Sequence, residues 1–160
     1  MTMAAVKHPL VSVLVPANDE AENLPEFMRQ AADVFASEPG KYEVIVIDDG
    51  STDSTPSVLA QLELEYPFLH SVRHRTRRGI ADALRTGYLH SRGDVLVFYP
   101  ADLQFKPEDI PKLVDPIIAG DFDMMTGRKE GEYEKAFVSG IYNGLSRKLF
   151  DVPVRDLNSV

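Results

Sequence analysis

The chain has 160 residues, of which 44% are hydrophobic and 26% charged, a balance that suits one globular domain with a hydrophobic core. A formal net charge of -8 argues against bulk attraction to nucleic acid, so no nucleic-acid partner is expected. The absence of cysteine excludes disulfides and thiol chemistry and fits a reducing compartment, so we expect a cytoplasmic location. No signal-peptide layout and no apolar run of roughly 18 residues is found, so any membrane contact is expected to be peripheral.

Short apolar runs predict five strands, and helical patterns separate them. The predicted strands are residues 10–15, 42–48, 68–73, 95–99 and 122–126. The predicted helices are residues 23 to about 39, a segment from residue 55, and residues 79–91, 108–119 and 134–150. Apolar strands that alternate with helices are typical of an α/β fold whose mostly parallel sheet is flanked by helices on both faces. We therefore expect a single domain over residues 1–160.

Helix-capping residues and one amphipathic pattern refine these predictions. Asn23 with Glu26 resembles a capping box, and Thr55 followed by Pro56 predicts an N-cap and a first helical position. In residues 134–150, apolar side chains recur at every fourth position, which predicts an amphipathic helix. This helix either packs on the core or lies on a lipid surface, and the pattern alone does not distinguish the two.

Residues that could contact a ligand, most of them polar, follow four of the predicted strands at the points where the strands end. They are Pro16, Asn18, Asp19 and Glu20, then Asp48, Asp49, Gly50, Ser51 and Asp53, then Asp102 and Gln104, and finally Arg128. Ligands of open parallel sheets bind beyond the carboxyl ends of the strands. Carboxylates gathered there need a cation, hydrogen-bond donors or a hydroxyl-rich ligand. A nucleotide sugar with a divalent metal supplies all three.

Each of these features also has a purely structural explanation. The sequence Asp49-Gly50-Ser51 is typical of an ordinary turn, and Asp102 could cap the helix that follows it. The basic stretch 73–78 is either a solvated face or a site for a phosphate group or anionic lipid before a helix N-terminus. The four His residues are scattered, which argues against a zinc site.

Five stretches, in their order and spacing, resemble the family 2 glycosyltransferases. They are VSVLVPANDEAENL, EVIVIDDGSTDST, RRGIADALRTGYLHSRGD, VFYPADLQFKPEDIPKL and TGRKEG. Within the family, the chain looks like the branch of dolichyl-phosphate mannose synthase and the bacterial polyprenyl-phosphate glycosyltransferases. The similarity runs from about Val11 to the end of the chain.

The resemblance implies a GT-A fold and an inverting transfer of a hexose from a UDP- or GDP-sugar to a polyprenyl or dolichyl phosphate. It implies a divalent metal, Mg or Mn, and a location at the cytoplasmic face of a membrane. It assigns nucleotide binding to Pro16, Ala17, Asn18, Glu20, Asp48, Asp49, Gly79 and Asp82, metal binding to Asp102 and Gln104, and catalysis to Asp102, Arg128 and Asp156.

The chain departs from the family pattern at three places. Pro100 stands where the first metal-motif Asp is usual, and Ala81 replaces a common glycine. The chain also ends at Val160, inside the last motif, so we expect that the C-terminal part of the family domain is missing. These departures leave open a nucleotide-sugar-binding module that does not catalyse. A phosphoacceptor receiver domain is a further alternative, because VIVIDDGS places paired acids at a strand end.

Overall fold

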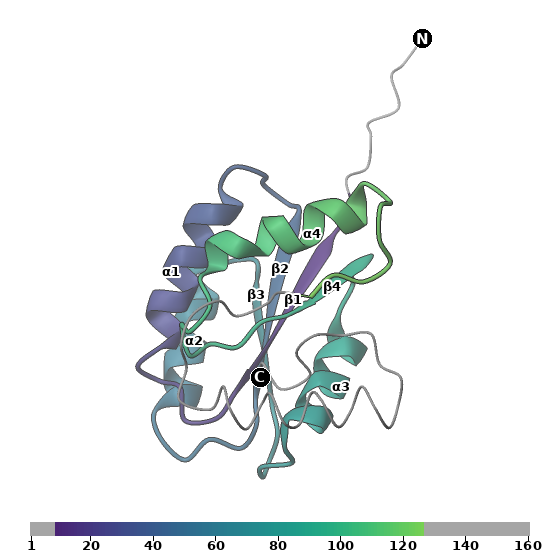
Figure 1. Ribbon diagram of the computed structural model, residues 1–160. Coiled ribbons are helices and arrows are strands. Elements are labelled where there is room, and N and C mark those ends of the chain that lie inside the picture. Colours follow the sequence, from purple (N-terminus) through teal and green to yellow (C-terminus); the bar gives the residue numbers. More distant parts are fainter. Residues whose placement is uncertain (1–8, 127–160) are drawn as a thin grey trace, which may run out of the picture. The chain divides into compact units, whose positions relative to one another are not determined.

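The computed structural model describes residues 9–126 of the chain (Figure 1). Contacts divide the chain into one unit of residues 1–125 and another of residues 126–160. The helix predicted at residues 134–150 lies outside the described residues, as do Arg128 and Asp156. The prediction of a single domain therefore stays a prediction.

The described residues form four parallel strands and five helical segments in alternation. In chain order they are β1 Val11–Ala17, α1 Leu24–Phe35, β2 Tyr42–Asp48, α2 Thr55–Glu65, β3 Leu69–Arg73, α3 Ile80–His90, β4 Val95–Phe98, the 3-10 turn η1 Pro107–Asp109 and α4 Ile110–Ile118. The strand order is β3-β2-β1-β4. This alternation confirms the predicted α/β class, and the strand order differs from the 2-1-3-4-5 order of receiver domains, which excludes that alternative.

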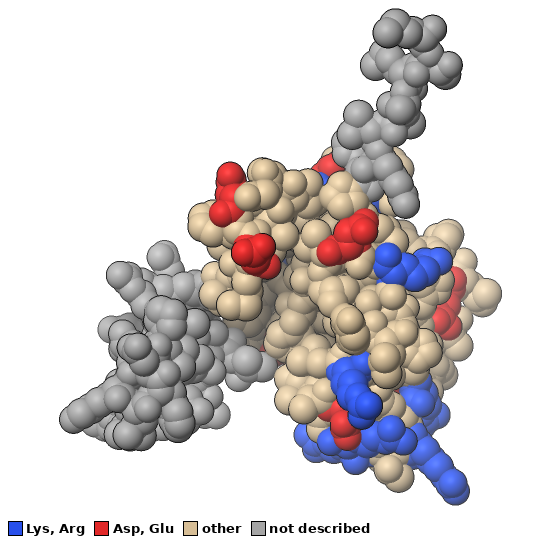
Figure 2. Space-filling view, turned by 90° about the vertical axis from the view of Figure 1, so that its right-hand side faces the viewer, with Lys and Arg blue, Asp and Glu red and all other residues tan. Residues whose placement is uncertain are grey.

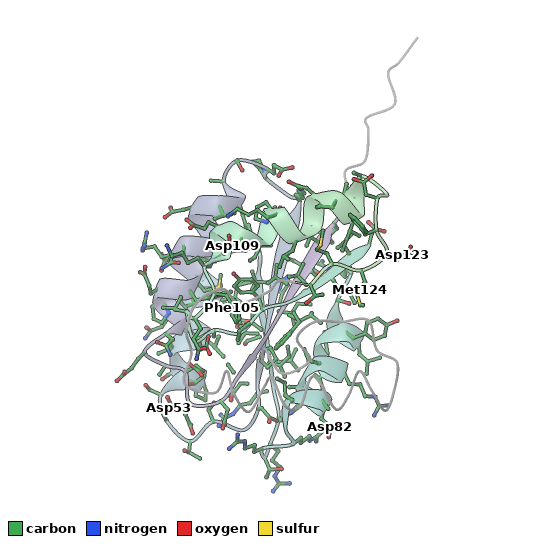
Figure 3. The ribbon with its side chains drawn as sticks, in the orientation of Figure 1. Asp53, Asp82, Phe105, Asp109, Asp123 and Met124 are labelled. Atoms are coloured by element: carbon green, nitrogen blue, oxygen red, sulfur yellow. The ribbon has the colours of Figure 1, made fainter. Side chains whose placement is uncertain are left out.

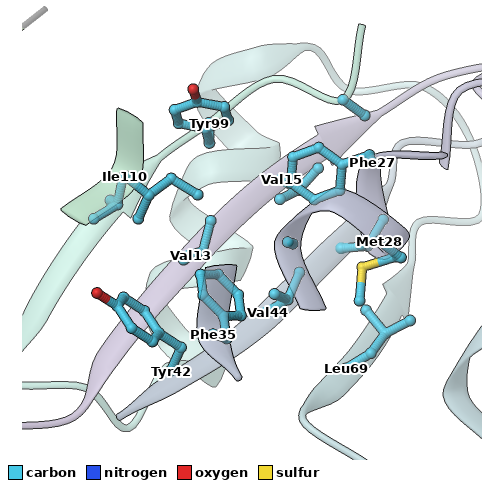
Figure 4. Close-up of a cluster of buried hydrophobic side chains, with 14 of the residues drawn as sticks. Val13, Val15, Phe27, Met28, Phe35, Tyr42, Val44, Leu69, Tyr99 and Ile110 are labelled. Atoms are coloured by element: carbon cyan, nitrogen blue, oxygen red, sulfur yellow. The ribbon is translucent and has the colours of Figure 1, made fainter. Parts of the chain in front are cut away.

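The sheet buries a hydrophobic layer on each face. Alternate β1 residues Val11, Val13 and Val15 pack with residues of α1, α2 and α4 in the larger cluster. Leu14 points the other way and packs with Ala83 of α3. Figure 1 shows α3 apart from the other helices, and Figure 4 shows the aromatic side chains of the larger cluster around β1. Helices therefore cover both faces, as the sequence predicted, and the central strands β1 and β2 are packed on two sides.

Three predicted features differ at the ends of elements. Residues 122–126 form no strand: Phe122 and Met124 are 56% and 74% exposed, and the described sheet contains no partner for their backbone. An alternating apolar pattern does not supply the neighbouring strand that a ladder requires. The helix predicted to reach residue 39 ends at Phe35. The segment predicted from residue 108 begins as the 3-10 turn and becomes α-helical only at Ile110.

The predicted helix caps also differ. Asn23 forms no cap, because its side chain donates to Glu20 Oε2 at 2.7 Å, while Glu26 accepts bonds from Arg29 and Gln30. The capping box is therefore absent from α1. Helix α2 begins one residue earlier than predicted, with Ser54 at the N-cap position and a proline in its first turn. None of the described helices is long and apolar enough to span a bilayer.

A buried carboxylate ties three strands together at the amino ends of the sheet. Glu43 is 2% exposed and accepts bonds from Ser12 Oγ at 2.6 Å, from the Arg92 backbone at 2.8 Å and from the Arg92 guanidinium at 2.6 Å. Ser12 Oγ in turn accepts the N–H of Gly93, just before β4. Burial opposes ionisation of Glu43, but the bonds from Ser12 and Arg92 outweigh it and lower the pKa of this carboxyl. An ionised Glu43 thus joins β1, β2 and the approach to β4.

Replacing the arginine of this network tests its contribution to stability. Arg92→Ala is expected to lower the free energy of unfolding by about 1–3 kcal/mol, because the buried Glu43 loses its charged donor. Arg29→Ala is the matched control: Arg29 pairs with Glu26 and Asp33 on the exposed surface of α1, and its loss is expected to cost less than about 1 kcal/mol. Urea unfolding measures both variants, and equal losses would contradict the role given to Glu43.

Candidate functional site

The carboxyl-edge loops, residues 18–23 after β1, 49–54 after β2 and 74–79 after β3, lie where three adjacent parallel strands end. The register pairs Ala17 with Asp48, and Asp48 with Arg73, so these ends are level. Figure 3 labels Asp53 and Asp82 at this end of the sheet. The sequence therefore predicted correctly that polar residues following β1 and β2 would meet at one edge.

Hydrogen bonds join the first of these loops to the second. Asp19, at a φ of 60°, accepts the N–H groups of Thr52 at 2.7 Å and Asp53 at 3.2 Å through Oδ1. Asn18 donates from Nδ2 to the Asp49 carbonyl at 3.2 Å. The Asp19 carboxylate therefore acts within the protein, as the anchor of the 51–53 turn.

Glu20 and Asp48 make further bonds within the carboxyl-edge loops. The Glu20 N–H donates to Thr55 Oγ1 at 2.9 Å, so the start of α1 is tied to the start of α2. Asp48 is 1% exposed, and its Oδ1 accepts the Ser51 N–H at 2.8 Å. Its Oδ2 lies 3.1 Å from Nε of Arg73, an ion pair that lacks hydrogen-bond alignment. Asp48 Oδ2 is thus a buried carboxylate oxygen with no well-aligned donor among the described residues.

Asp49 connects the second loop to the third. Its Oδ1 lies 2.7 Å from Nδ1 of His74 and accepts the Arg78 N–H at 2.9 Å, and its Oδ2 accepts the Gly79 N–H at 2.7 Å. On the other side of its ring, His74 Nε2 lies 2.8 Å from Thr86 Oγ1 of α3. Burial opposes ionisation, but the bonds from His74, Arg78 and Gly79 outweigh it and lower the pKa of Asp49. An ionised Asp49 therefore holds the start of α3 against the end of β2.

Sequence reasoning missed His74. It counted His74 within the basic stretch 73–78 and noted that the His residues lacked metal-ligand spacing, yet His74 is 4% exposed between the exposed arginines Arg73 and Arg75. A histidine at the end of a predicted strand, inside a basic stretch, gives no signal of its own. Its burial depends on the third loop folding over the second.

Gly50 allows the third loop to approach the second closely. Its φ is +73°, and a Cβ built there would lie 2.5 Å from the Arg77 nitrogen and 2.6 Å from the Thr76 carbonyl carbon. Both the backbone conformation and the contact therefore require glycine. The Asp49-Gly50-Ser51 turn thus has a structural role, and residues 76–77 pack against it.

The segment after β4 is built differently. Tyr99 is buried and packs against Phe27 of α1 and against Phe105, with ring centroids 6.3 and 6.2 Å apart. Asp102 is half-buried, and its Oδ1 accepts the Gln104 N–H at 3.1 Å. That local bond is the one Asp102 makes among the described residues, so it is not bonded to the carboxyl-edge loops.

Oxygen donors suited to a hard cation are present at Asp102 and Gln104, but they do not form a closed site. Across residues 9–126, no three His, Cys, Asp or Glu side chains are grouped closely enough to hold a metal ion. Mg²⁺ and similar cations are often held by one or two carboxylates, with the remaining ligands supplied by substrate phosphates and water. The residues present therefore fit a metal shared with a diphosphate, and they do not fit an all-protein cage.

The remaining predicted site residues lie at the same end of the sheet or outside the described residues. Pro16 and Ala17 form the end of β1, where Pro16 is half-buried and Ala17 is buried. Gly79, at a φ of 91°, precedes α3, and Asp82 is exposed in the first turn of that helix. Arg128 and Asp156 lie outside the described residues, and their predicted roles stay predictions.

A parallel sheet of this order, covered by helices on both faces, with polar loops at its carboxyl edge, is common to several nucleotide-binding folds. The family and the solved structures that this chain resembles identify it as the GT-A fold. The chain belongs to glycosyl transferase family 2, whose sequence pattern matches residues 12–149. This confirms the resemblance drawn from the sequence.

Known proteins similar to this chain agree with that membership. The undecaprenyl-phosphate 4-deoxy-4-formamido-L-arabinose transferase of Sodalis glossinidius (strain morsitans) is 35% identical over 129 residues, which cover 79% of this chain and 39% of that protein. The mannosyltransferase PcManGT from Pyrobaculum calidifontis, solved in complex with GDP-Man and Mn²⁺, is 34% identical with a TM-score of 0.52, over 61% of this chain and 28% of its own. The chain thus spans about two fifths or less of these relatives.

The mannosyl-3-phosphoglycerate synthase from Rubrobacter xylanophilus has the same fold at lower identity. Its TM-score is 0.59 at 19% identity, over 69% of this chain and 36% of its own. At this identity the similarity concerns the fold alone.

Substitution of Gly50 tests the close approach of the second and third loops. Gly50→Ala is expected to lower the free energy of unfolding by about 2 kcal/mol more than Gly40→Ala, because the added methyl group overlaps the backbone of residues 76–77. Gly40 is the matched control: its φ is +81°, but nothing lies within 4 Å of its added Cβ, so only the backbone strain of about 1 kcal/mol applies. If both variants lose the same free energy of unfolding in urea, the contact between the two loops does not contribute to stability.

Asp49→Asn tests the carboxylate that holds the third loop. An amide cannot accept every bond that Asp49 accepts, so an N–H of Arg78 or Gly79 loses its acceptor at a cost of about 1–3 kcal/mol. The lowered pKa of Asp49 means that its stabilising contribution is present above the ordinary value of 3.8 and is lost as pH falls through the lowered value.

The variant should therefore lose less stability than the wild type between neutral and strongly acidic pH. Asp33→Asn on the exposed face of α1 serves as control and is expected to change stability by less than about 0.5 kcal/mol. Urea unfolding across this pH range measures both. An unchanged acid dependence in Asp49→Asn would mean that Asp49 is not the titrating group.

Proposed function

We propose that the protein transfers a hexose from a nucleotide-diphospho-sugar to a polyprenyl phosphate with inversion at the sugar, at the cytoplasmic face of a membrane. The observation that carries the proposal is that loops following β1, β2 and β3 of a family 2 chain are hydrogen-bonded into one polar edge. The polyprenyl-phosphate acceptor is supported by the name of the relative from Sodalis glossinidius. The nucleotide donor is supported by the GDP-Man complex of PcManGT.

The nucleoside would lie over the ends of β1 and β2. Pro16, Ala17, Asn18 and Glu20 line the end of β1, and Asp48 and Asp49 end β2. Asp48 Oδ2 is the buried carboxylate oxygen there without a well-aligned donor, so a donor N–H of a base would complete it. Gly79 and Asp82 would border the same donor from the start of α3.

A divalent metal would be held by Asp102 and Gln104, and it would stabilise the negative charge of the leaving diphosphate when bound. Pro100 stands where a further oxygen ligand would be expected, so the protein would hold the metal through fewer bonds and would depend more on the donor's own phosphates. Arg128 would add positive charge to the same diphosphate.

The reaction itself is a direct displacement. An oxygen of the acceptor phosphate forms a bond to the anomeric carbon, and the bond from that carbon to the diphosphate oxygen breaks on the opposite face. The electron pair of the broken bond goes to the departing nucleoside diphosphate. A phosphate monoester with a second pKa near about 6 is largely ionised at neutral pH, so no proton needs to be removed from it. Asp156 would therefore orient the acceptor more than it would act as a base.

A binding module without catalysis is the second candidate, and Pro100 favours it because a carboxylate is missing from the metal set. Such a module would bind the donor and would leave the acceptor unglycosylated. Sugar transfer to undecaprenyl phosphate in detergent, measured with labelled GDP- and UDP-sugars, separates the two candidates. Donor binding without transfer, in a chain that includes the rest of the family domain, would support the module.

Titration calorimetry with GDP- and UDP-sugars tests the site itself. Mn²⁺ is expected to strengthen donor binding about tenfold in the wild type, and Asp102→Asn should remove that gain while leaving metal-free binding unchanged. Asp121→Asn, at an exposed carboxylate beyond α4, is the control and should retain the gain. Absence of binding for every nucleotide would overturn the proposal, and an unaltered Mn²⁺ effect in Asp102→Asn would place the metal elsewhere.

A further inference from the structure

A basic surface lies beside the carboxyl edge of the sheet. It consists of the exposed arginines Arg75, Arg77 and Arg78 of the third loop and Arg85 of α3. Figure 2 shows Lys and Arg side chains gathered at the lower end of the face that carries α3. Among the described residues, no carboxylate forms an ion pair with any of these four side chains, although the chain as a whole carries a charge of -8. The surface is therefore positively charged, although the protein as a whole is negatively charged.

Two acidic residues adjoin this surface, Asp49 through its bonds to the third loop and Asp82 on α3, and they do not neutralise it. Asp49 is buried and bonded to His74, Arg78 and Gly79. Asp82 is exposed in the first turn of α3 and carries one negative charge against four arginines. The net charge of the surface is therefore positive.

Exposed apolar side chains accompany the arginines on α3. Helix α3 packs on the sheet through Ala83 and Gly87; a Cβ on Gly87 would lie 2.8 Å from Ile47. Arg85, Tyr88 and Leu89 are spaced at three and four residues on the opposite, outer face, where Tyr88 is 61% and Leu89 69% exposed. Ile80, at the start of the helix, is 49% exposed. An outer helix face of this kind combines cationic and apolar groups.

We propose that the third loop, residues 74–79, and the outer face of α3 form a docking surface for an anionic lipid bilayer. Arginines attract the negative headgroups, while tyrosine and leucine side chains enter the boundary between headgroups and acyl chains. A soluble diphosphate would use the arginines and would leave Tyr88 and Leu89 without a role, so the combination favours a membrane. This inference rests on the proposed function for one point: docking here places the carboxyl edge beside the bilayer that contains the lipid acceptor.

Flotation with lipid vesicles tests the surface without donor or acceptor. The 160-residue chain is expected to float with vesicles of equal parts phosphatidylglycerol and phosphatidylcholine, and to remain unbound with phosphatidylcholine alone. Replacing Arg75, Arg77 and Arg85 together with alanine should weaken binding about a hundredfold, at roughly fivefold for each arginine near an anionic surface. Replacing Tyr88 and Leu89 with serine should weaken it about tenfold, because less apolar area enters the interface.

A matched triple variant controls for the lost charge. Arg29, Lys106 and Lys112 are exposed and lie on or near α1 and α4, and their replacement with alanine should leave vesicle binding unchanged. Circular dichroism establishes that each variant is folded. Absence of wild-type binding, or an equal loss in both triple variants, would overturn the proposal.

Calorimetry with pyrophosphate distinguishes a lipid surface from a soluble anion. Two results together would overturn the membrane inference: the wild type does not bind vesicles, and its binding of pyrophosphate is lost when the three arginines are replaced. The surface would then be a site for a soluble phosphate. If the docking proposal is wrong, the chain will not bind vesicles but can still bind the nucleotide-sugar donor. If the glycosyltransferase proposal is wrong, the chain will not bind the donor but can still bind vesicles, so the two outcomes are separable.

Discussion

The buried carboxylate of Asp49 determines how the carboxyl edge of this sheet is built. It accepts the backbone N–H groups of Arg78 and Gly79 and faces His74, so it joins the end of β2 to the start of α3. Gly50, the next residue, leaves room for the same loop to come within contact distance. A negative charge at this depth is stable only because its donors surround it, and those donors are supplied by a segment about 25 to 30 residues further along the chain.

A second buried carboxylate joins separate segments in the same way at the opposite end of the sheet. Glu43 joins β1, β2 and the residues before β4 through Ser12 and Arg92. The sheet is therefore fastened by ionised groups at both ends and by apolar side chains between them. Such an arrangement fixes the relative positions of the strand ends, and these positions are what a site made of loops requires.

The carboxylates that suggest nucleotide binding also hold the loops in place. Asp19 anchors the 51–53 turn, and Asp49 anchors the third loop. Asp48 differs, since one of its oxygens is buried without a well-aligned donor. Among the buried acidic side chains that the structure describes, Asp48 is the one with an oxygen that lacks an aligned hydrogen-bond donor. The arginines beside these loops belong to a separate surface, whose apolar neighbours on α3 favour a bilayer.

The amino-acid sequence by itself determined the α/β class and the four described strands to within two residues at each end, because both follow from local apolar runs. It also determined the gathering of acidic loops at one edge, because parallel strands end together. The predicted capping box at Asn23 was wrong, because a side chain bonds to whichever donor or acceptor lies near it in space. The predicted strand at residues 122–126 was wrong, because a strand needs another strand beside it. Only the tertiary structure decided that His74 is buried against Asp49, that Glu43 binds Arg92 and that Arg85 shares a face with Tyr88 and Leu89. The first two depend on contacts between distant segments, and the third on which side of α3 packs against the sheet.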